Sequence, residues 1–462
     1  MSVTEPIAEP TASTTAGPAQ STAGPVASST AEPVASPGSP AAAPKLPPAF
    51  HRLWAASASS SLGDGVYYAA LPLLAATMTH DPVLLGLVTS AALLPWFFFG
   101  LLGGALVDRW DRRRTMWLTD LARAVLLAVP VAAAVLHRLS IPLLIAVAFL
   151  LGIGQILFDT AGSAYLPQLL RRDMTLLQQA NARQQGTTTV FADFAGPPAG
   201  SLLFTLGRAF PFGLDALSFL ASSLLIRSLP GGDSTARPAP VREKTADGPS
   251  LWREARAGVG CLVRHKVLLG LALRPAIGNL AFVGADAVLV LFAHQLLHLG
   301  DFGFGLLLAS QAVGGLLGAA LAGRLGSLLG TGGALTATAL LEGAALLGFG
   351  LSGNPFLGGA ALALLGAAMA ATMVLGPSVG QALIPAELAG RVGAARRLLS
   401  VGAAPLGALL GGWLARSEGL RAPFLAGAVM LAATAVFSLT LTSNRSIEQA
   451  LAAVAAGEPA AA

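Results

Sequence analysis

Several ionisable side chains stand inside long apolar runs of the sequence, and they are the first candidates for chemistry. Asp64 is the clearest, because it lies in the small, polar stretch Ser59–Gly65 within an otherwise apolar run. Removal from water favours the protonated form of a carboxylate. We therefore expect Asp64 to take up and release a proton or to contact a ligand directly. The plainer alternative is a structural hydrogen bond to another helix.

Other polar and aromatic side chains share this apolar setting. Gln155 and Asp159 are one helical turn apart, so they lie on one face of a helix. Tyr67 and Trp96 could form part of an aromatic wall for a bulky apolar ligand, or simply pack in a core. The residues expected to line a ligand cavity are Tyr67, Trp96, Gln155, Asp159, Asp193, Arg274, Asn279 and Asp286.

The sequence has none of the usual signatures of an enzyme. It contains no Gly-x-x-x-x-Gly-Lys run for ATP phosphates. Its six histidines are scattered, and Cys261 is its sole cysteine, so no set of residues has the spacing of a metal site. We expect no catalytic activity, no cofactor and no metal.

The elements that must position these residues follow from composition. Only 11% of the 462 residues are charged and 54% are hydrophobic, whereas ordinary soluble domains carry about 25% charged residues. The apolar residues form repeated runs of about 20, which is the length that crosses a bilayer. The composition therefore indicates an all-α, multi-pass membrane protein. The net charge of +5 does not indicate nucleic-acid binding, because the basic residues fall in short breaks between the runs.

Apolar runs separated by charged or Gly/Pro breaks predict twelve transmembrane helices. They centre on residues 50–79, 82–106, 116–136, 141–165, 186–207, 212–229, 267–298, 303–323, 333–352, 356–380, 398–415 and 422–442. We expect a disordered cytoplasmic tail over 1–48, a six-helix bundle over 49–229, a cytoplasmic linker over 230–266, a second six-helix bundle over 267–442 and a cytoplasmic tail over 443–462.

The two predicted bundles repeat each other. Parallel six-helix repeats are an arrangement found in transporters, with the substrate near the midplane between them. In this repeat Asn279 occupies the place of Asp64, and we expect it to face the same cavity. The matching segments are Gly103–Arg109 with Gly318–Arg324, Gly63–Tyr67 with Gly278–Phe282, and Gly196–Ala199 with Ala404–Gly407.

The distribution of basic residues predicts the orientation. If the N-terminus is cytoplasmic, most of the 28 lysine and arginine residues fall in cytoplasmic segments. Arg138, Arg208, Arg416 and Arg421 are the loop residues that do not. We therefore expect both termini on the cytoplasmic side of the cell (inner) membrane.

One basic loop carries a resemblance to a known family. The run Gly104-x-Leu106-Val107-Asp108-Arg109-x-x-Arg112-Arg113 resembles the loop between helices 2 and 3 of the major facilitator superfamily. Within that superfamily, the runs SSLGDG, LLPWF, DRWDRRR and LGALLGG are most similar to the bacterial multidrug, macrolide and siderophore (enterobactin-type) exporters. Asp111 departs from the usual pattern, which has glycine at that position.

The resemblance implies roles for two motifs. Gly104, Asp108, Arg109, Arg112 and Arg113 would form a conformational gate, with Asp108 near the N-terminus of helix 11, around residues 398–400. The plain alternative is an anchor for membrane orientation. Gly196, Pro197 and Gly200 resemble a partial antiporter motif in helix 5, or a simple packing motif. The arginine that many proton-coupled members carry on helix 4 is missing between Arg138 and Arg171.

Together these features predict a secondary transporter that exports an amphipathic small molecule in exchange for protons by alternating access. The expected partners are that substrate, protons and the lipid bilayer, with no nucleic acid, and the protein is expected to be a monomer. The alternatives are an importer or lipid flippase of the same fold, or, more remotely, a membrane sensor or polytopic membrane enzyme.

Overall fold

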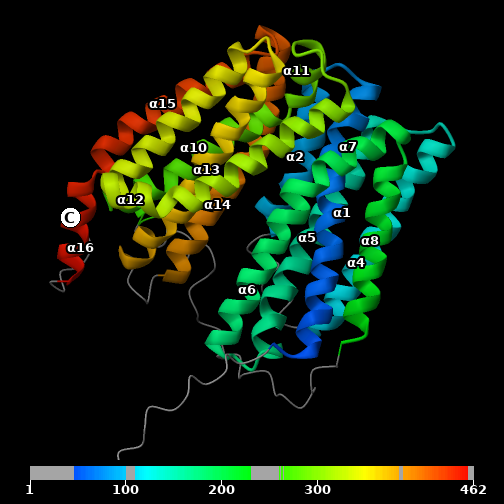
Figure 1. Cartoon of the computed structure of the whole chain (residues 1–462), viewed down its shortest axis with the longest axis horizontal. Coiled ribbons are helices and arrows are strands. Elements are labelled where there is room, and N and C mark those ends of the chain that lie inside the picture. Colours follow the sequence, from blue (N-terminus) through cyan, green and yellow to red (C-terminus); the bar gives the residue numbers. More distant parts are fainter. Residues whose placement is uncertain are drawn as a thin grey trace, which may run out of the picture. The chain divides into compact units, whose positions relative to one another are not determined.

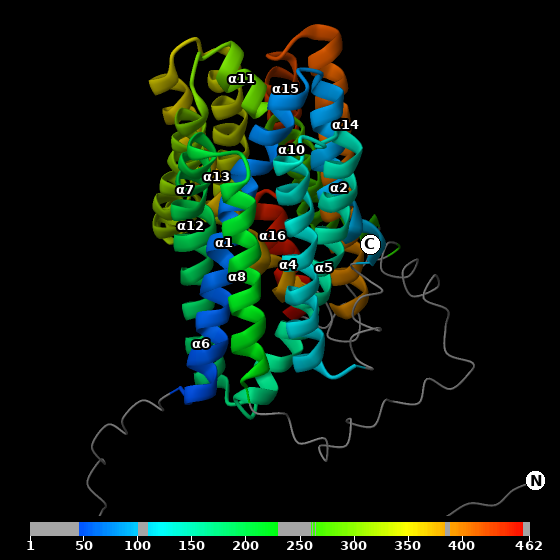
Figure 2. The same ribbon diagram turned by 90° about the vertical axis from the view of Figure 1, so that its right-hand side faces the viewer.

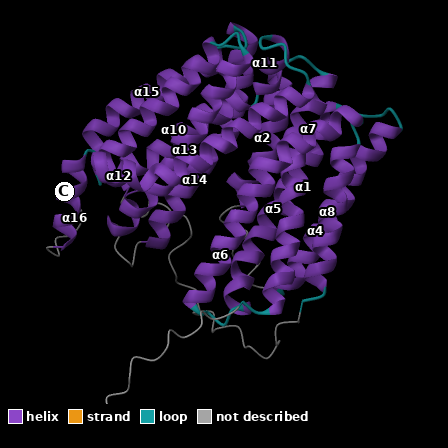
Figure 3. Cartoon of the chain, viewed as in Figure 1, coloured by secondary structure: helices purple, strands orange, loops and turns teal. Residues whose placement is uncertain are grey.

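The computed structural model describes residues 46–99, 110–229, 260, 262–263, 265–383 and 389–455. Within these ranges the chain is helical and contains no strand (Figure 3). The helices of the first part are α1 (Pro48–Met78), α2 (Pro82–Phe99), α4 (Arg112–Val135), α5 (Ile141–Leu169), α6 (Met174–Thr188), the π-helix η1 (Thr189–Ala195), α7 (Gly196–Leu206) and α8 (Phe210–Arg227). Those of the second part are α10 (Lys266–Asp286), α11 (Leu289–Gln295), α12 (Asp301–Leu351), α13 (Pro355–Leu383), α14 (Ala389–Glu418), α15 (Ala422–Leu441) and α16 (Asn444–Ala455).

The helices pack mainly with others from the same part of the chain (Figures 1 and 2). In the first part α1 contacts α7 and α8, and α4 contacts α5 and α8. In the second part α12 contacts α13 and α15, and α10 contacts α14 and α15. The two most extensive contacts between the parts are those of α2 with α14 and of α7 with α12. We call the parts the first half and the second half.

Within the described residues, nine helices are long and apolar enough to cross a membrane. The difference from the twelve predicted spans has three causes. α1 contains the polar run Ser57–Asp64, which lowers its mean hydropathy. The fifth predicted span is divided among α6, η1 and α7, and α12 joins the eighth and ninth. The molecule is thus a multi-pass helical membrane protein, and the number twelve stays a prediction.

The break in the fifth predicted span, residues 186–207, has a local cause. Pro197 and Pro198 have no backbone N–H, so they cannot bond to the carbonyls four residues back. The N–H of Gly196 instead donates to the carbonyl of Phe191, five residues back. This π-helical geometry marks η1, which lies between the polar helix α6 and the apolar helix α7.

α12 is two helical segments joined at Gly330, whose φ of 70° interrupts the helix and favours glycine. Asn444, the first residue of α16, closes this break. Its side-chain oxygen Oδ1 accepts a hydrogen bond from Gly332 N at 2.8 Å, and its side-chain nitrogen Nδ2 donates to the Leu329 carbonyl at 2.8 Å. α16 lies in the segment 443–462 expected to be a tail, and Ile447 is buried against α10 and α12 residues there.

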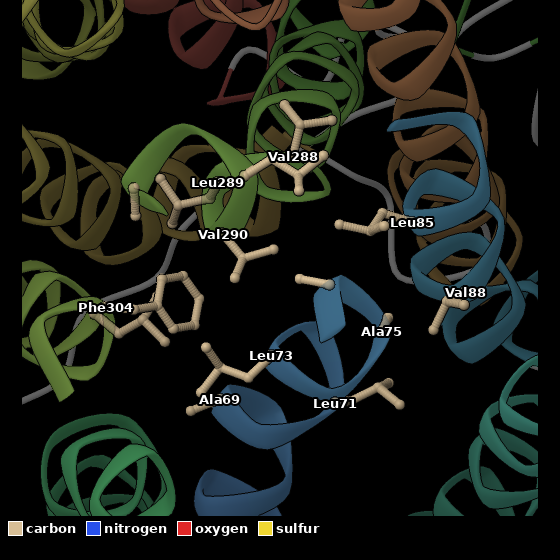
Figure 4. Close-up of a cluster of buried hydrophobic side chains, with 14 of the residues drawn as sticks. Ala69, Leu71, Leu73, Ala75, Leu85, Val88, Val288, Leu289, Val290 and Phe304 are labelled. Atoms are coloured by element: carbon tan, nitrogen blue, oxygen red, sulfur yellow. The ribbon is translucent and has the colours of Figure 1, made fainter. Parts of the chain in front are cut away.

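The halves meet tightly at the end of α1 marked by Met78, which we call the Met78 end. There buried side chains of α1, among them Leu73 and Ala75, lie beside Val288–Val290, with Leu85 and Val88 of α2 close by (Figure 4). Arg416 of α14 also pairs with Asp81 at 3.3 Å. An apolar seal therefore closes the space between the halves at this end.

Candidate functional site

Arg123 of α4 is the centre of a buried polar cluster in the first half. It is only 4% exposed, and its Nη2 lies 2.8 Å from Asp64 Oδ1 of α1. The same nitrogen donates to the Gln155 side-chain carbonyl of α5, and Nη1 lies 3.5 Å from Asp120 Oδ1. The guanidinium also stacks on Phe219 of α8, 3.7 Å from the ring centre. One cation thus ties four helices together.

Small residues on α1 make room for this cluster. A side chain at Gly63 would collide with Asp215 and Ser218 of α8, so the missing Cβ lets these groups stand directly beside Asp64. Ser218 Oγ donates to Asp215 Oδ1 at 3.1 Å. A second buried carboxylate therefore lies next to the Asp64–Arg123 pair.

The cluster contains three residues that were not among the sequence candidates: Asp120, Arg123 and Asp215. Asp120 is fully buried and accepts from Ser222 Oγ. The sequence does contain a signal for these three residues. Asp120 and Arg123 are three residues apart inside one apolar run, and Asp215 is a lone charged residue inside another apolar run. Arg123 belongs to the third predicted span, which precedes the span that lacks an arginine, and it lines the cavity described next.

A cavity of about 860 Å³ lies against this cluster, and every residue that lines it falls between Leu53 and Phe219. Asp64, Tyr67, Trp96, Gln155 and Asp159 are all on its wall, as expected from the sequence. So are Asn181 and Gln184 of α6, which lie before the predicted start of the fifth span and were missed.

Four expected cavity residues do not line this cavity. Asn279 donates to the Ser400 carbonyl at 2.8 Å and to its hydroxyl at 3.0 Å, which ties α10 to α14. Arg274 is buried and pairs with Glu342 at 3.3 Å. Asp286 accepts from Tyr68 Oη at 3.0 Å, a bond between the two halves. Asp193 is exposed on η1.

The expected gate is only partly visible, because Gly104, Asp108 and Arg109 lie outside the described residues. Arg112 donates to the Ala164 carbonyl at 3.2 Å and Arg113 to the Arg227 carbonyl at 2.6 Å. Both therefore hold the start of α4 against helices of the same half. Asp111, the departure from the usual motif, caps α4 by accepting from Arg114 N at 2.7 Å.

One part of the gate geometry differs from the expectation. α14 begins at Ala389, so residues 398–400 are inside this helix and not at its N-terminus. A helix dipole acts only within the terminal turn, so it does not favour a carboxylate beside those residues. The sequence expectation placed the start of the helix too late because basic residues at 396 and 397 resembled a loop.

The helix 5 motif holds α7 against α1. A Cβ at Gly196 would lie 2.6 Å from the Cα of Gly65, and one at Gly200 would meet the backbone of Val66. The carbonyl of Pro197 lies against Gly305 of α12 in the second half. These residues thus support close helix packing directly beside Asp64.

Comparison with known families agrees with this architecture. The sequence profile of a family described as transmembrane secretion effectors, within the major facilitator superfamily, matches residues 39–459. The chain belongs to this family. The transporter is 28% identical over 378 residues to the enterobactin exporter EntS of Citrobacter koseri, covering 79% of this chain and 85% of the relative. It is 27% identical over 411 residues to the multidrug efflux pump Tap of Mycolicibacterium fortuitum, covering 86% and 96%.

Solved structures share the fold of the transporter. A bacterial homologue of the iron transporter ferroportin, in an inward-facing state, matches with a TM-score of 0.68 at 15% identity, covering 87% of this chain and 100% of that one. At this identity the likeness concerns the fold alone. The resemblance seen in the basic loop and in the intramembrane motifs is therefore confirmed at the level of the superfamily, and the relatives are transporters and not enzymes.

Proposed function

We propose that this transporter exports an amphipathic small molecule from the cytoplasm in exchange for protons, with Asp64 as the coupling residue. The observation that supports it is the Asp64–Arg123 pair on the wall of a large cavity. The exporter names of EntS and Tap favour the outward direction.

The proposed coupling follows from the charges around Arg123. Asp64 is 34% exposed, whereas Asp120 is fully buried, so Asp64 is the partner of Arg123 that a proton from the cavity reaches. A proton on Asp64 removes its charge and weakens the pair, since an ion pair gains more than a neutral hydrogen bond. Arg123 then shifts towards Asp120, which changes the contacts between α1 and α4.

Alternating access supplies the transport step. In the present structure the halves are sealed at the Met78 end by apolar contacts, so we place the cavity in its cytoplasm-facing state, with the termini cytoplasmic and the protein in the cell membrane. Rocking of the halves would open the Met78 end and deliver the substrate outside. A proton entering from outside would then bind to the Asp64 carboxylate and begin the next transport cycle.

The test uses purified protein in liposomes with an imposed pH gradient and a panel of labelled compounds: ethidium, erythromycin and a catecholate siderophore. We expect uphill accumulation of at least one compound, abolished by a proton uncoupler. Asp64→Asn should abolish this uphill transport but keep exchange of labelled for unlabelled substrate, because exchange needs no proton.

Glu448→Gln is the control, since it removes one exposed carboxylate on α16, away from the cavity. It should transport like the unmodified chain. Proton-driven accumulation retained by Asp64→Asn would refute the coupling role, and transport that ignores the pH gradient would refute proton exchange.

A further inference from the structure

The wall of the cavity suits a large apolar ligand. Aromatic and aliphatic side chains from α1, α2, α5 and α8 line it, including Leu53, Trp96, Leu151, Phe158 and Phe219. Cavities of this size hold small organic molecules and are usually apolar with few polar groups. A ligand that fills the site therefore has an apolar body.

The charged groups on the wall do not balance. They are three carboxylates, Asp64, Asp159 and Asp215, and one guanidinium, Arg123. Arg123 already pairs with Asp64 and also lies near Asp120 behind the wall. The cavity therefore has an excess of acidic groups.

Asp159 is the acidic group that a ligand can reach. It is exposed to the cavity, and both of its oxygens accept only from the Gln155 amide, each at 3.0 Å. No lysine, arginine or histidine among the described residues lies within ion-pair distance of it. A cation from outside the protein is the partner that this carboxylate lacks.

Two further polar groups at the cavity also lack partners. The Tyr67 hydroxyl is buried and has no hydrogen-bond partner in the described part of the chain. Arg123, itself 4% exposed, has no partner for Nε. Buried polar groups are normally satisfied. The Tyr67 hydroxyl can accept as well as donate, so it is free to bond to a polar group of a ligand, whereas the Arg123 N–H only donates and does not pair with a cation.

We propose that this cavity selects an amphipathic cation, whose positive group pairs with Asp159 while its apolar body contacts the aromatic wall. The inference rests on the proposed transport function and names its substrate class. Gln155 connects the cation site at Asp159 with the Asp64–Arg123 pair, because its side-chain amide donates to Asp159 and its side-chain carbonyl accepts from Arg123. Binding at Asp159 is thereby linked to the proton site at Asp64.

Arg397, a cationic side chain of the second half, contacts the wall of this cavity at Trp96. Arg397 of α14 stacks on Trp96, 5.3 Å from the ring centre, and Trp96 lines the same cavity as Asp159. It is too far to form an ion pair with Asp159 here. A bound cation and Arg397 would therefore compete for this carboxylate when the halves close.

The experiment measures equilibrium binding to the full chain in lipid nanodiscs. Tetraphenylphosphonium and tetraphenylborate are the probes, because they share size and shape and differ in the sign of their charge. We expect the cation to bind and the anion to bind at least about tenfold more weakly, as the loss of a charge-assisted contact predicts. Asp159→Asn should weaken binding of the cation by about tenfold.

Asp159→Glu keeps the charge and should bind the cation within about threefold of the unmodified chain, which separates loss of charge from misfolding. Glu448→Gln should bind like the unmodified chain. Equal binding of both probes, or unchanged binding by Asp159→Asn, overturns the cation proposal.

The two proposals fail in different ways. Proton-driven transport of neutral or anionic compounds by a chain that does not bind the cation overturns this inference and leaves the proposed transport intact. Selective binding of the cation without any pH-driven movement of it overturns proton exchange and leaves the cation site intact.

Discussion

At the scale of single residues, Arg123 makes most of the contacts that link the members of the buried polar cluster. It is the one cation that Asp64 and Asp120 share among the described residues, and it reaches Gln155 and Phe219 as well. A buried charge is tolerated when it is paired, and the loss of its partner leaves an uncompensated charge behind. The stability of this region therefore depends on Arg123 more than on any one carboxylate.

Replacement of this cation should destabilise the protein. We expect Arg123→Ala to lower the free energy of unfolding by about 3–5 kcal/mol, because it leaves the half-buried Asp64 and the fully buried Asp120 without their cation. The double variant Arg123→Ala/Asp64→Asn should recover part of this loss, since one stranded charge is then neutral. Thermal unfolding in detergent measures both, with Arg138→Ala in an exposed loop as the control. A double variant less stable than Arg123→Ala would contradict the pairing.

The sequence was informative where a polar residue stood out from an apolar run. Asp64, Gln155 and Asp159 were found in this way, and they do line one cavity. Arg123 was missed because it follows a basic loop closely and resembled the edge of a span. Asn279 was misplaced because repeat position does not fix the direction of a side chain, which here meets Ser400.

At the scale of elements, the junction of η1 with α1 places the polar cluster. The π-helical turn directly precedes Pro197 and Pro198, which lack the N–H groups of a regular α-helix. The glycines of α1 and α7 allow the backbones to meet. The apolar periodicity predicted that a span exists here but not that it breaks, since a break depends on which carbonyls lose their donors. The Gly330 break in α12 differs, because it falls within residues 324–332, the gap between the predicted eighth and ninth spans.

A methyl group at this junction should be enough to disturb it. A Cβ at Gly65 would collide with the backbone of Ala192 in η1, so we expect Gly65→Ala to cost about 1–3 kcal/mol of stability and to impair transport. Gly278→Ala is the matched control, because nothing lies within 4 Å of a Cβ there. It should leave stability unchanged or raise it by up to about 1 kcal/mol. Equal melting temperatures for the two variants would refute this account of the junction.

At the scale of the whole molecule, the two halves are held at the Met78 end by different kinds of contact. The apolar seal is fully buried, whereas Arg416 in the Arg416–Asp81 pair is 64% exposed. Exposed ion pairs contribute about 0–1 kcal/mol, so the seal must provide most of the closure. The Tyr68–Asp286 bond adds one polar contact between α1 and α10.

Because the apolar seal contributes more to closure than the Arg416–Asp81 pair, loss of the ion pair should open the Met78 end less than a smaller side chain in the seal does. In a chain with Cys261→Ser and a reporter Ala75→Cys, we expect Arg416→Ala to speed labelling by an impermeant maleimide no more than about fivefold. Val290→Ala, which thins the seal, should speed it further. Arg421→Ala is the control, because Arg421 bonds to Gly350 within its own half. Faster labelling in Arg416→Ala than in Val290→Ala would show that the ion pair, and not the seal, keeps this end shut.

The position of Asn444 has a practical consequence for anyone who attaches a tag or a reporter to this protein. A fusion made directly after Thr442, where the last apolar run ends, would delete the side chain that bridges Leu329 and Gly332 and the buried Ile447. Attachment beyond Ala455 keeps both. We therefore advise placing fluorescent or affinity fusions after this short terminal helix, even though hydropathy alone marks it as dispensable.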